Sequence, residues 1–399
     1  MRISLVGLGK SNFSLLRRIC GYHELFVSER RKLSEKEIEE LKRCGADYEV
    51  GHTERVLDSD VVVVSPGVSP LSEVGRMILE KSKRHETEVS MFFQLFKPSA
   101  KVVGVTGTNG KTTTTRMIAH FLEKKGFSVC LCGNNERPVS DLKEDVDFIV
   151  LELSSFQLFW SSMIPIDFGL LLNVRPDHMD WHGSFEDYEM AKLKIVRFSK
   201  VALVPPDYSS VAKTYGSVDL SLIPQHLRSS QNVENASAAA SIIEEMGFDP
   251  FEFLDSLSDF TPPSHRMEFV GSIDGVDFFN DSKATNTHAV MKALENFDKV
   301  TLILSGILKE RDLEEFKEFL RRKVEAVILL GEKIKEIGKL DVPTYGASTM
   351  EDAVKKALEV SSGVVLFSPG GASFDMYSNY EERGEDFKRV VREMIEGGI

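Results

Sequence analysis

The sequence predicts an α/β protein of three domains, each built on a mainly parallel sheet covered by helices. The chain has 399 residues, which is too long for a single compact core. Three stretches repeat one pattern, a β-branched apolar run followed by an amphipathic helical pattern, which is typical of parallel sheets. We expect a Rossmann-like domain over residues 1–93, a central domain over 94–262 and a second Rossmann-like domain over 263–399.

Composition limits the class of partner. The net charge of -13 argues against nucleic acid or an anionic membrane, because both favour a surplus of Lys and Arg. The chain opens without a signal-peptide pattern, and it has no run of about 18 apolar residues. We therefore expect a cytoplasmic protein with neither partner, and a monomer. Its cysteines are predicted to be reduced, buried apolar side chains rather than a disulfide framework; they are Cys20, Cys44, Cys130 and Cys132.

The first stretch alternates strands and helices. Residues 2–7, "RISLVG", predict a strand that turns into a helix. "ELFVSE" predicts a second strand, and Ser34 with Glu37 three residues later predicts a capping box at the next helix start. "DVVVVSPGVS" then predicts a buried strand that ends in a Pro-Gly turn.

The turn after the first strand carries "GLGKSN", which matches the dinucleotide pattern G-x-G-x-x-G except that Asn12 replaces the third glycine. Glu29 ends the second strand, where such proteins place an acid for the ribose. An NAD-binding protein therefore stays open as an alternative at this point.

The second stretch predicts strands at 101–105, 147–154 and 168–174, and helices at about 185–198 and 234–246. A boundary near residues 90–98 separates it from the first stretch.

The third stretch follows the turn-forming residues Thr261, Pro262 and Pro263. It opens with a predicted hairpin whose two-residue turn is Asp274-Gly275. Apolar runs beginning at residues 300, 325 and 364 predict further strands that alternate with helices.

The segment "GTNGKT" lies between a predicted strand and a predicted helix, which is the setting of a phosphate-binding loop. Lys111 is expected to reach the β and γ phosphates, and Thr112 to place its hydroxyl on Mg²⁺. The loop is a variant of G-x-x-x-x-G-K-[ST], because Val105 stands at the first glycine position and Gly104 lies one residue earlier.

Two further segments carry candidate metal ligands. Glu152 ends a predicted strand, where a carboxylate either holds Mg²⁺ beside the phosphate loop or is a solvated cap. The loop "DHMDWH" contains Asp177, His178, Asp180 and His182, and it is either a metal-binding wall or a polar loop before a helix capped by Ser184. Taken alone, Lys192 on that helix is expected to be a solvated surface charge.

Six motifs, in order along nearly the whole chain, resemble the Mur ligase family. They are "GVTGTNGKTTTT", "LELSSFQL", "DHMDWHGSFEDYEMAK", "PPSHRMEF", "NDSKATN" and "SPGGASFDMY". The resemblance implies a central P-loop ATPase domain and an ATP-dependent amide ligase that works through an acyl phosphate. Its most similar branch adds D-glutamate to UDP-N-acetylmuramoyl-L-alanine, while another muramyl stage, a folylpolyglutamate-type reaction or addition of lysine stays open.

The resemblance also implies roles for individual residues. The expected cofactors are ATP and two Mg²⁺ ions, with a CO₂-derived carbamate on Lys192. Catalytic residues would be Lys111, His178, Lys192 and Arg266. Metal ligands would be Thr112, Glu152, His178 and Lys192. ATP contacts would be Gly107, Thr108, Asn109, Gly110, Lys111, Thr112, Thr113, Asn134, Asn232, Asn235, Arg266 and Asp281.

The two other substrates have their own expected contacts. The UDP part would meet Ser11, Asn12, Ser65, Gly67 and Val68. The incoming amino acid would meet Lys283, Thr285, Lys309, Ser373, Phe374 and Tyr380, of which Tyr380 stands where the family usually has Phe.

Overall fold

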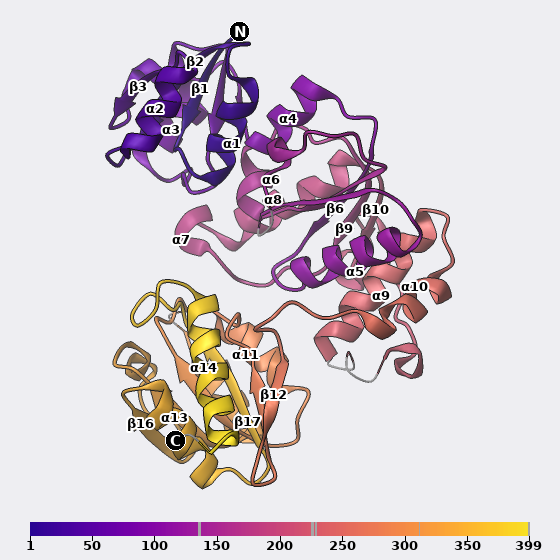
Figure 1. Ribbon diagram of the computed structural model, residues 1–399, viewed down its shortest axis with the longest axis vertical. Helices are drawn as coiled ribbons and strands as arrows, with labels where there is room; N and C mark the ends of the chain where they lie inside the picture. Colours follow the sequence, from indigo (N-terminus) through magenta and orange to yellow (C-terminus); the bar gives the residue numbers. More distant parts are fainter. Residues whose placement is uncertain (135–136, 225–226, 228–229, 311, 398–399) are drawn as a thin grey trace. The chain divides into compact units, whose positions relative to one another are not determined.

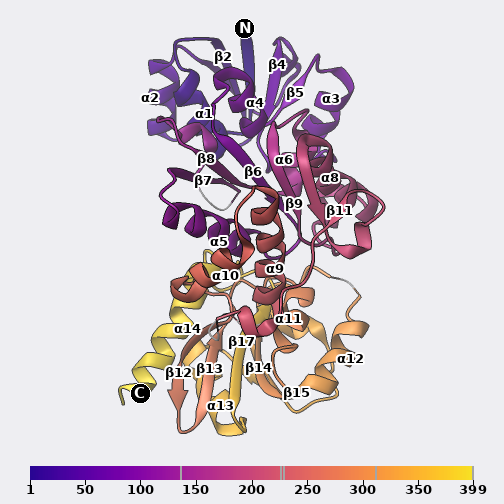
Figure 2. The same cartoon turned by 90° about the vertical axis from the view of Figure 1, so that its right-hand side faces the viewer.

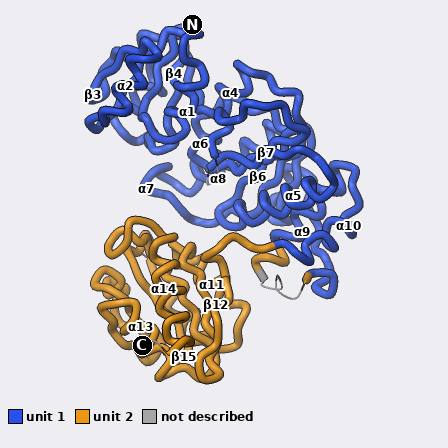
Figure 3. Tube along the Cα trace, viewed as in Figure 1, with its two compact units in different colours: residues 1–223, 235–260 blue, residues 224–234, 261–399 orange. Residues whose placement is uncertain are grey.

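The computed structural model describes residues 1–399 except 135–136, 225–226, 228–229, 311 and 398–399. The described residues form three sheets, each flanked by helices (Figure 1). The chain divides into two compact units, residues 1–223 with 235–260, and 224–234 with 261–399 (Figure 3). The first unit contains two of the sheets and the second unit contains the third.

The first sheet has the strand order β3-β2-β1-β4-β5, and all its paired neighbours are parallel. Its strands are β1 (Arg2–Val6), β2 (Glu24–Glu29), β3 (Asp47–Val50), β4 (Val61–Val64) and β5 (His85–Glu86). Its helices are α1 (Lys10–Ile19), α2 (Glu35–Arg43), α3 (Glu73–Lys81) and α4 (Glu88–Phe96). The predicted capping box is confirmed, because Ser34 accepts from the main-chain N–H of Glu37 and the Glu37 side chain accepts from that of Ser34.

The second sheet has the order β11-β10-β9-β6-β8-β7 and is also parallel throughout. Its strands are β6 (Lys101–Thr106), β7 (Val129–Gly133), β8 (Phe148–Glu152), β9 (Ile166–Leu171), β10 (Ser199–Val204) and β11 (Lys213–Thr214). Its helices are α5 (Lys111–Lys124), α6 (Ser155–Trp160), α7 (Met179–His182), α8 (Phe185–Phe198), α9 (Ser230–Glu245) and α10 (Pro250–Ser256), several of them labelled in Figure 2.

One face of the second sheet packs on α6 and α8, where Leu158 and Ile195 join a core with alternate strand residues such as Ile149 and Leu151. Helices α5 and α10 pack on each other through Phe121 and Phe253. This layering leaves the C-terminal ends of β6, β8 and β9 together at one sheet edge, where ligands of parallel α/β sheets bind.

The third sheet has the order β12-β13-β17-β14-β15-β16. Its strands are β12 (Glu268–Ile273), β13 (Val276–Asn280), β14 (Val300–Ser305), β15 (Val324–Leu330), β16 (Thr344–Ala347) and β17 (Val364–Gly370), and only β12 is antiparallel to its neighbour. Its helices are α11 (Thr287–Leu294), α12 (Glu314–Lys323), α13 (Met350–Val360) and α14 (Tyr380–Ile395). The predicted hairpin turn is confirmed, because Asp274 and Gly275 both have positive φ, at 50° and 84°.

The expected boundary between residues 93 and 94 falls inside helix α4, so a division there would cut the helix. The domain limits stay a prediction.

The prediction of four reduced cysteines was wrong for one pair. Cys20 and Cys44, which follow the last residues of α1 and α2, form a disulfide, because the two helix ends lie together, with 4.9 Å between the Cα atoms. Cys130 and Cys132 are free and buried, as predicted.

Across the described ranges, every helix is too short or too polar to cross a membrane.

Candidate active site

The "GTNGKT" segment, the predicted phosphate-binding loop, joins strand β6 to helix α5. Gly107 and Gly110 have φ values of 159° and 88°. The main chain therefore turns sharply and brings Lys111 to the first position of α5. The Nζ atom of Lys111 folds back over the loop and donates to the carbonyl oxygens of Gly107 at 2.9 Å and Thr108 at 3.0 Å. A cation held above the loop in this way is placed to meet a phosphate.

Gly110 makes room for Asn235 of α9. A Cβ atom on Gly110 would lie 2.2 Å from Oδ1 of Asn235, so only glycine fits at this position. Asn235 is buried, and within the described part of the chain its Nδ2 atom has no hydrogen-bond partner. A buried amide donor without a partner is costly unless a ligand satisfies it. The predicted ATP contact Asn232 lies on the same helix, three residues earlier.

Two side chains that the sequence did not single out hold the loop in place. Asn173, just beyond β9, accepts from the main-chain N–H of Asn109 at 2.9 Å and donates to its carbonyl at 3.2 Å. The hydroxyls of Thr108 and Tyr188 are 2.8 Å apart. An Asn directly after a buried strand at the binding edge was the available signal for Asn173.

Lys192 is buried, so the expectation of a surface charge, based on the helix alone, was wrong. Its Nζ atom donates to the carbonyl of Gly107 at 2.7 Å and lies 4.7 Å from the Tyr188 ring centroid. Burial, and then the positive charge of Lys111, hold the pKa of Lys192 well below its usual range. The lysine predicted to carry a carbamate therefore lies against the phosphate loop and has a strong tendency to be neutral.

Glu152 ends β8 and is fully buried, which excludes the solvated cap. Its Oε1 atom accepts from Nδ2 of Asn134 at 3.0 Å, and its main-chain carbonyl accepts from the N–H of Asn134. The structure therefore brings together two residues that were predicted separately.

The donors at this edge suit Mg²⁺ that arrives with phosphate. Thr112 in the first turn of α5 and Glu152 both offer oxygen, the ligand type that Mg²⁺ prefers. The described residues contain no group of three or more His, Cys, Asp or Glu side chains that could hold a metal. Mg²⁺ commonly takes one or two carboxylates and completes its shell with water and substrate phosphates, so the residues present fit it.

The "DHMDWH" loop divides into two environments rather than forming one metal-binding wall. His178 has a left-handed main chain with φ of 59°, and its Nε2 atom lies 3.6 Å from Oδ2 of Asp177. His182 instead points to Ser155, with 3.0 Å between Nε2 and Oγ. Burial, followed by the neighbouring His178, lowers the pKa of His182 to about 4, so this ring is neutral. Ser184 caps α8 as predicted.

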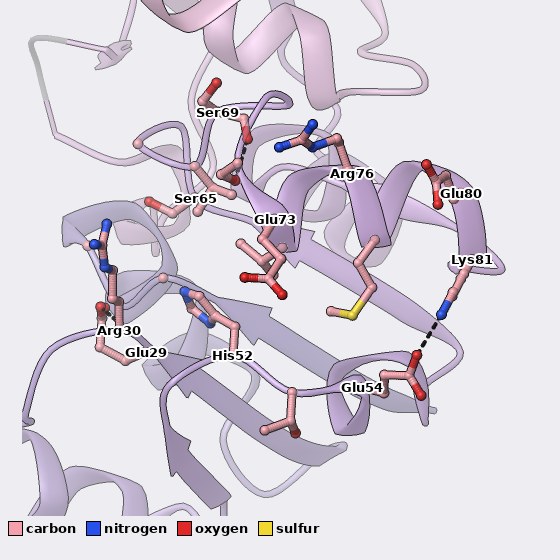
Figure 4. A pocket seen from close by; sticks show the side chains of 18 residues that line it. Glu29, Arg30, His52, Glu54, Ser65, Ser69, Glu73, Arg76, Glu80 and Lys81 are labelled. Carbon is pink, nitrogen blue, oxygen red and sulfur yellow. Dashed lines mark hydrogen bonds and ion pairs between the residues drawn. The ribbon is translucent and has the colours of Figure 1, made fainter.

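The first sheet carries a cavity of about 1130 Å³ at the C-terminal ends of β1 and β4 (Figure 4). Ser65, Gly67 and Val68, predicted to contact the UDP part, line it. Ser11 and Asn12 are not among its lining residues. Asn12 is fully buried, and its amide donates to the Gly7 carbonyl at 2.8 Å. Lining residues that the sequence did not single out include His52, Thr53, Ser69, Ser72, Glu73 and Arg76.

Glu29 bears on the NAD alternative. Its carboxylate accepts from the main-chain N–H of Leu8 at 2.6 Å, within the "GLGKSN" turn. A dinucleotide would place its pyrophosphate against the amides of this turn. Because a protein carboxylate already occupies one of them, the turn disfavours that use.

In the second unit, Asp281 lies just beyond β13. It accepts from the Ser368 hydroxyl at 2.8 Å and from the main-chain N–H of Met267 at 3.3 Å. Burial raises the pKa of Asp281 to about 7, although the Ser368 hydrogen bond opposes the rise. Arg266, the other predicted ATP contact of this region, precedes Met267 directly.

Residues predicted for the amino acid gather at the C-terminal edge of the third sheet. Lys283 lies over the Tyr380 ring, with Nζ 5.1 Å from its centroid. Ile307 and Ala372 exchange two main-chain hydrogen bonds, which brings together the segments that continue to Lys309 and to Ser373. Thr285 is half-buried, and Phe374 is 74% exposed.

Buried Arg383 links two of these segments, although the sequence did not single it out. Its guanidinium donates to the Ser282 carbonyl at 2.8 Å and to the Gly371 carbonyl at 3.0 Å.

Comparison with known proteins agrees with this architecture. Three family models match the chain: the MurD N-terminal domain over residues 2–74, the Mur ligase middle domain over 105–245, and the Mur ligase glutamate ligase domain over 265–371. A UDP-N-acetylmuramoylalanine--D-glutamate ligase of Thermotoga sp. (strain RQ2) is 40% identical over 422 residues, covering 98% of both chains. A ligase of the same name from Thermosipho africanus is 39% identical and covers both chains completely.

Solved structures with lower sequence identity share the fold. A MurF ligase from Thermotoga maritima in complex with ADP has a TM-score of 0.61 at 18% identity, covering 95% of this chain and 99% of its own. UDP-N-acetylmuramate-alanine ligase MurC from the same organism has a TM-score of 0.57 at 19% identity, with complete coverage of both chains. With family models along its length and relatives of about 40% identity over nearly all of it, the chain belongs to the Mur ligase family.

Proposed function

We propose that this protein uses ATP to join D-glutamate to UDP-N-acetylmuramoyl-L-alanine in peptidoglycan precursor synthesis. The observation that carries the proposal is full-length identity of about 40% to ligases named for this reaction, together with the MurD model over the first domain. We further propose that it acts as a cytoplasmic monomer.

The ATP half of the reaction takes place at the phosphate loop. Lys111, above the Gly107 and Thr108 carbonyls, would turn toward the β and γ phosphates and neutralise their charge. The free amide donor of Asn235 beside Gly110 would bind the nucleotide. Further proposed ATP contacts are the loop residues Gly107, Thr108, Asn109, Gly110, Thr112 and Thr113, together with Asn134, Asn232, Arg266 and Asp281.

The chemistry proceeds in two steps. The substrate carboxylate attacks the γ-phosphorus, ADP leaves, and an acyl phosphate forms. The amine of D-glutamate then attacks the acyl carbon, the amine loses a proton, and inorganic phosphate leaves with the C–O bonding electrons. The protein contributes position and positive charge rather than covalent chemistry. Mg²⁺ held by Thr112 and Glu152 would supply further charge neutralisation.

We propose that Lys192 carries a carbamate, which with His178 would provide ligands for a second Mg²⁺. An amine attacks CO₂ only when it is neutral, and both burial and Lys111 favour the neutral form of Lys192. Equilibration with ¹³C-bicarbonate should give a carbamate resonance that is absent from Lys192→Ala. Full activity of that variant would contradict a role for the carbamate.

The cavity of the first sheet is the proposed site of the UDP part. Its volume of about 1130 Å³ is large enough for a nucleotide sugar. Arg76 and the hydroxyls of Ser65 and Ser69 line it and could meet the diphosphate.

The third sheet provides the proposed amino-acid pocket. Lys283 and Lys309 would pair with carboxylates of D-glutamate, while Ser373 and Thr285 offer hydroxyls. Two carboxylates against two lysines favour glutamate over lysine as the incoming amino acid.

The test is phosphate release by the purified protein with ATP, Mg²⁺ and UDP-N-acetylmuramoyl-L-alanine, together with D-glutamate, L-glutamate or L-lysine. Release and amide product are expected only with D-glutamate, and Lys111→Met should abolish both. Turnover with L-lysine, or with a folate acceptor, would assign the chain to another reaction of the family. Tight NAD binding without ATP binding would overturn the proposal.

A further inference from the structure

A second cavity lies on the first unit, between the helices of the first sheet and the 3₁₀ turn η2 (Val139–Asp141) that follows β7. Its volume is about 510 Å³, within the usual range for small-molecule sites. It shares no lining residue with the cavity proposed for UDP, and the phosphate loop does not contribute to it. The cavity is lined by Ser14, Arg17, Arg18, Glu40, Arg43, Ser140, Asp141 and Lys143.

Charge makes this cavity unusual in an acidic protein. Four of its side chains are cationic and two are anionic, whereas the whole chain carries -13. The Oε1 atom of Glu40 forms ion pairs with two arginines, with Nε of Arg17 at 2.9 Å and with Nη2 of Arg43 at 2.5 Å. Asp141 accepts from the Ser14 hydroxyl, so that bond fixes the η2 turn against α1. A concave site with surplus positive charge attracts and concentrates anions.

The surplus charge belongs to Arg18 and Lys143. The Arg18 guanidinium lies 4.9 Å from the ring centroid of Phe96. Its Nε atom is buried, and no described residue accepts a hydrogen bond from it. Lys143 is exposed and makes no ion pair within the described part of the chain. The Phe96 ring orients the planar guanidinium of Arg18, and the flexible side chain of Lys143 lines the same cavity. An oriented guanidinium beside a mobile ammonium is a pair of groups suited to binding phosphate.

We propose that this cavity binds a phosphate-bearing small molecule, with the phosphate held by Arg18 and Lys143. The hydroxyl of Ser14 and the two arginines that pair with Glu40, Arg17 and Arg43, complete the rim. A nucleotide and a simpler phosphorylated metabolite share this chemistry. Because the site joins α1 of the first sheet to the segment after β7, occupancy would fix these two elements of the first unit against each other.

Calorimetric titration of the full chain with inorganic pyrophosphate tests the proposal. The same titration of the double variant Arg18→Gln/Lys143→Gln separates this cavity from the first-sheet cavity and the phosphate loop, because the double variant alters neither of them. One binding event of the unaltered protein is expected to weaken at least tenfold in the double variant. Arg322→Gln is the matched control, because Arg322 also stacks on a phenylalanine, Phe319, at 5.5 Å but lies outside the cavity.

Hydrogen exchange locates the site. Pyrophosphate should slow exchange in residues 14–18 and 139–143 of the unaltered protein and not in the double variant. The single variant Lys143→Gln changes only an exposed side chain, so weaker binding in it cannot be attributed to misfolding. Titration with UMP separates the two ligand sources: tighter binding than pyrophosphate points to a nucleotide, and weaker binding to a simpler phosphate. Absence of binding at millimolar pyrophosphate, or equal affinity in the double variant, would overturn the proposal.

Discussion

Glu86 and Glu88 are two residues apart and both buried, yet replacing each by a neutral side chain should change the free energy of unfolding in opposite directions. Glu86 accepts from Gln94 at 2.8 Å, from Arg84 at 3.0 Å and from both the hydroxyl and main-chain N–H of Ser162. Burial alone would raise its pKa, but these hydrogen bonds outweigh burial and the pKa is lowered. Its charge is therefore stabilised in the folded state.

Glu88 has far less compensation. Its Oε1 atom accepts from the main-chain N–H of Ser140 at 2.7 Å, and burial raises its pKa to about 7 from 4.5. Between these two values the folded protein retains a proton that the unfolded chain has released. The free energy of unfolding therefore falls as pH rises through this window, and the full loss, about 3 kcal/mol, is reached above pH 7.

Glu88→Gln removes the charge and keeps a carbonyl oxygen for Ser140. The free energy of unfolding should rise by up to about 3 kcal/mol at pH 8 and change little near pH 4.5. Glu86→Gln should instead lower it by about 2–4 kcal/mol at pH 8, because charged hydrogen bonds are lost in a buried site. Glu86→Gln is thus a matched control of opposite sign.

The chain offers a selective probe for this measurement. Both tryptophans, Trp160 and Trp181, lie in the first unit, so their fluorescence during urea unfolding reports on that unit alone. If Glu88→Gln destabilised the unit equally at both pH values, the assignment of a raised pKa to Glu88 would be wrong.

Two further predictions concern the phosphate loop. Gly110→Ala should weaken binding of an ATP analogue at least tenfold, because its Cβ would collide with Asn235; Gly126→Ala, at the same positive φ but with open space around it, should leave binding unchanged in the same titration. Asn173→Ala should raise the KM for ATP by up to about thirtyfold, since the main chain of Asn109 loses two hydrogen bonds of about 1 kcal/mol each; an unaltered KM would show that the loop holds its shape without Asn173.

The sequence predicted the strands of the three sheets well where they are buried and β-branched. Strand β2 was predicted at its observed limits, and so were helix α8 and strand β17. Short edge strands such as β5 and β11, of two residues each, were not predicted, because two residues are too few to show the alternation of apolar and polar side chains typical of a strand.

The site was less accessible to the sequence because it depends on contacts between distant residues. Nothing in the helical pattern around Lys192 distinguishes it from a surface lysine, and only the family resemblance gave this lysine a role in the site. The buried Nζ atom of Lys192 donates to the carbonyl of Gly107, which lies 85 positions earlier in the chain. The pairing of Cys20 with Cys44 likewise depends on how two helices end, which spacing alone does not specify.

That bridge makes the first sheet sensitive to the solution in which it is handled. It joins two residues 24 positions apart, and the loop that it closes contains the whole of β2, the strand next to the centre of the sheet. From loop-closure entropy alone, reducing this disulfide lowers the free energy of unfolding by about 3.5 kcal/mol, because the unfolded chain gains conformational entropy. A sample kept in dithiothreitol therefore differs from one kept in air. A destabilising substitution near α1 or α2 that the oxidised protein tolerates would unfold the first sheet of the reduced protein.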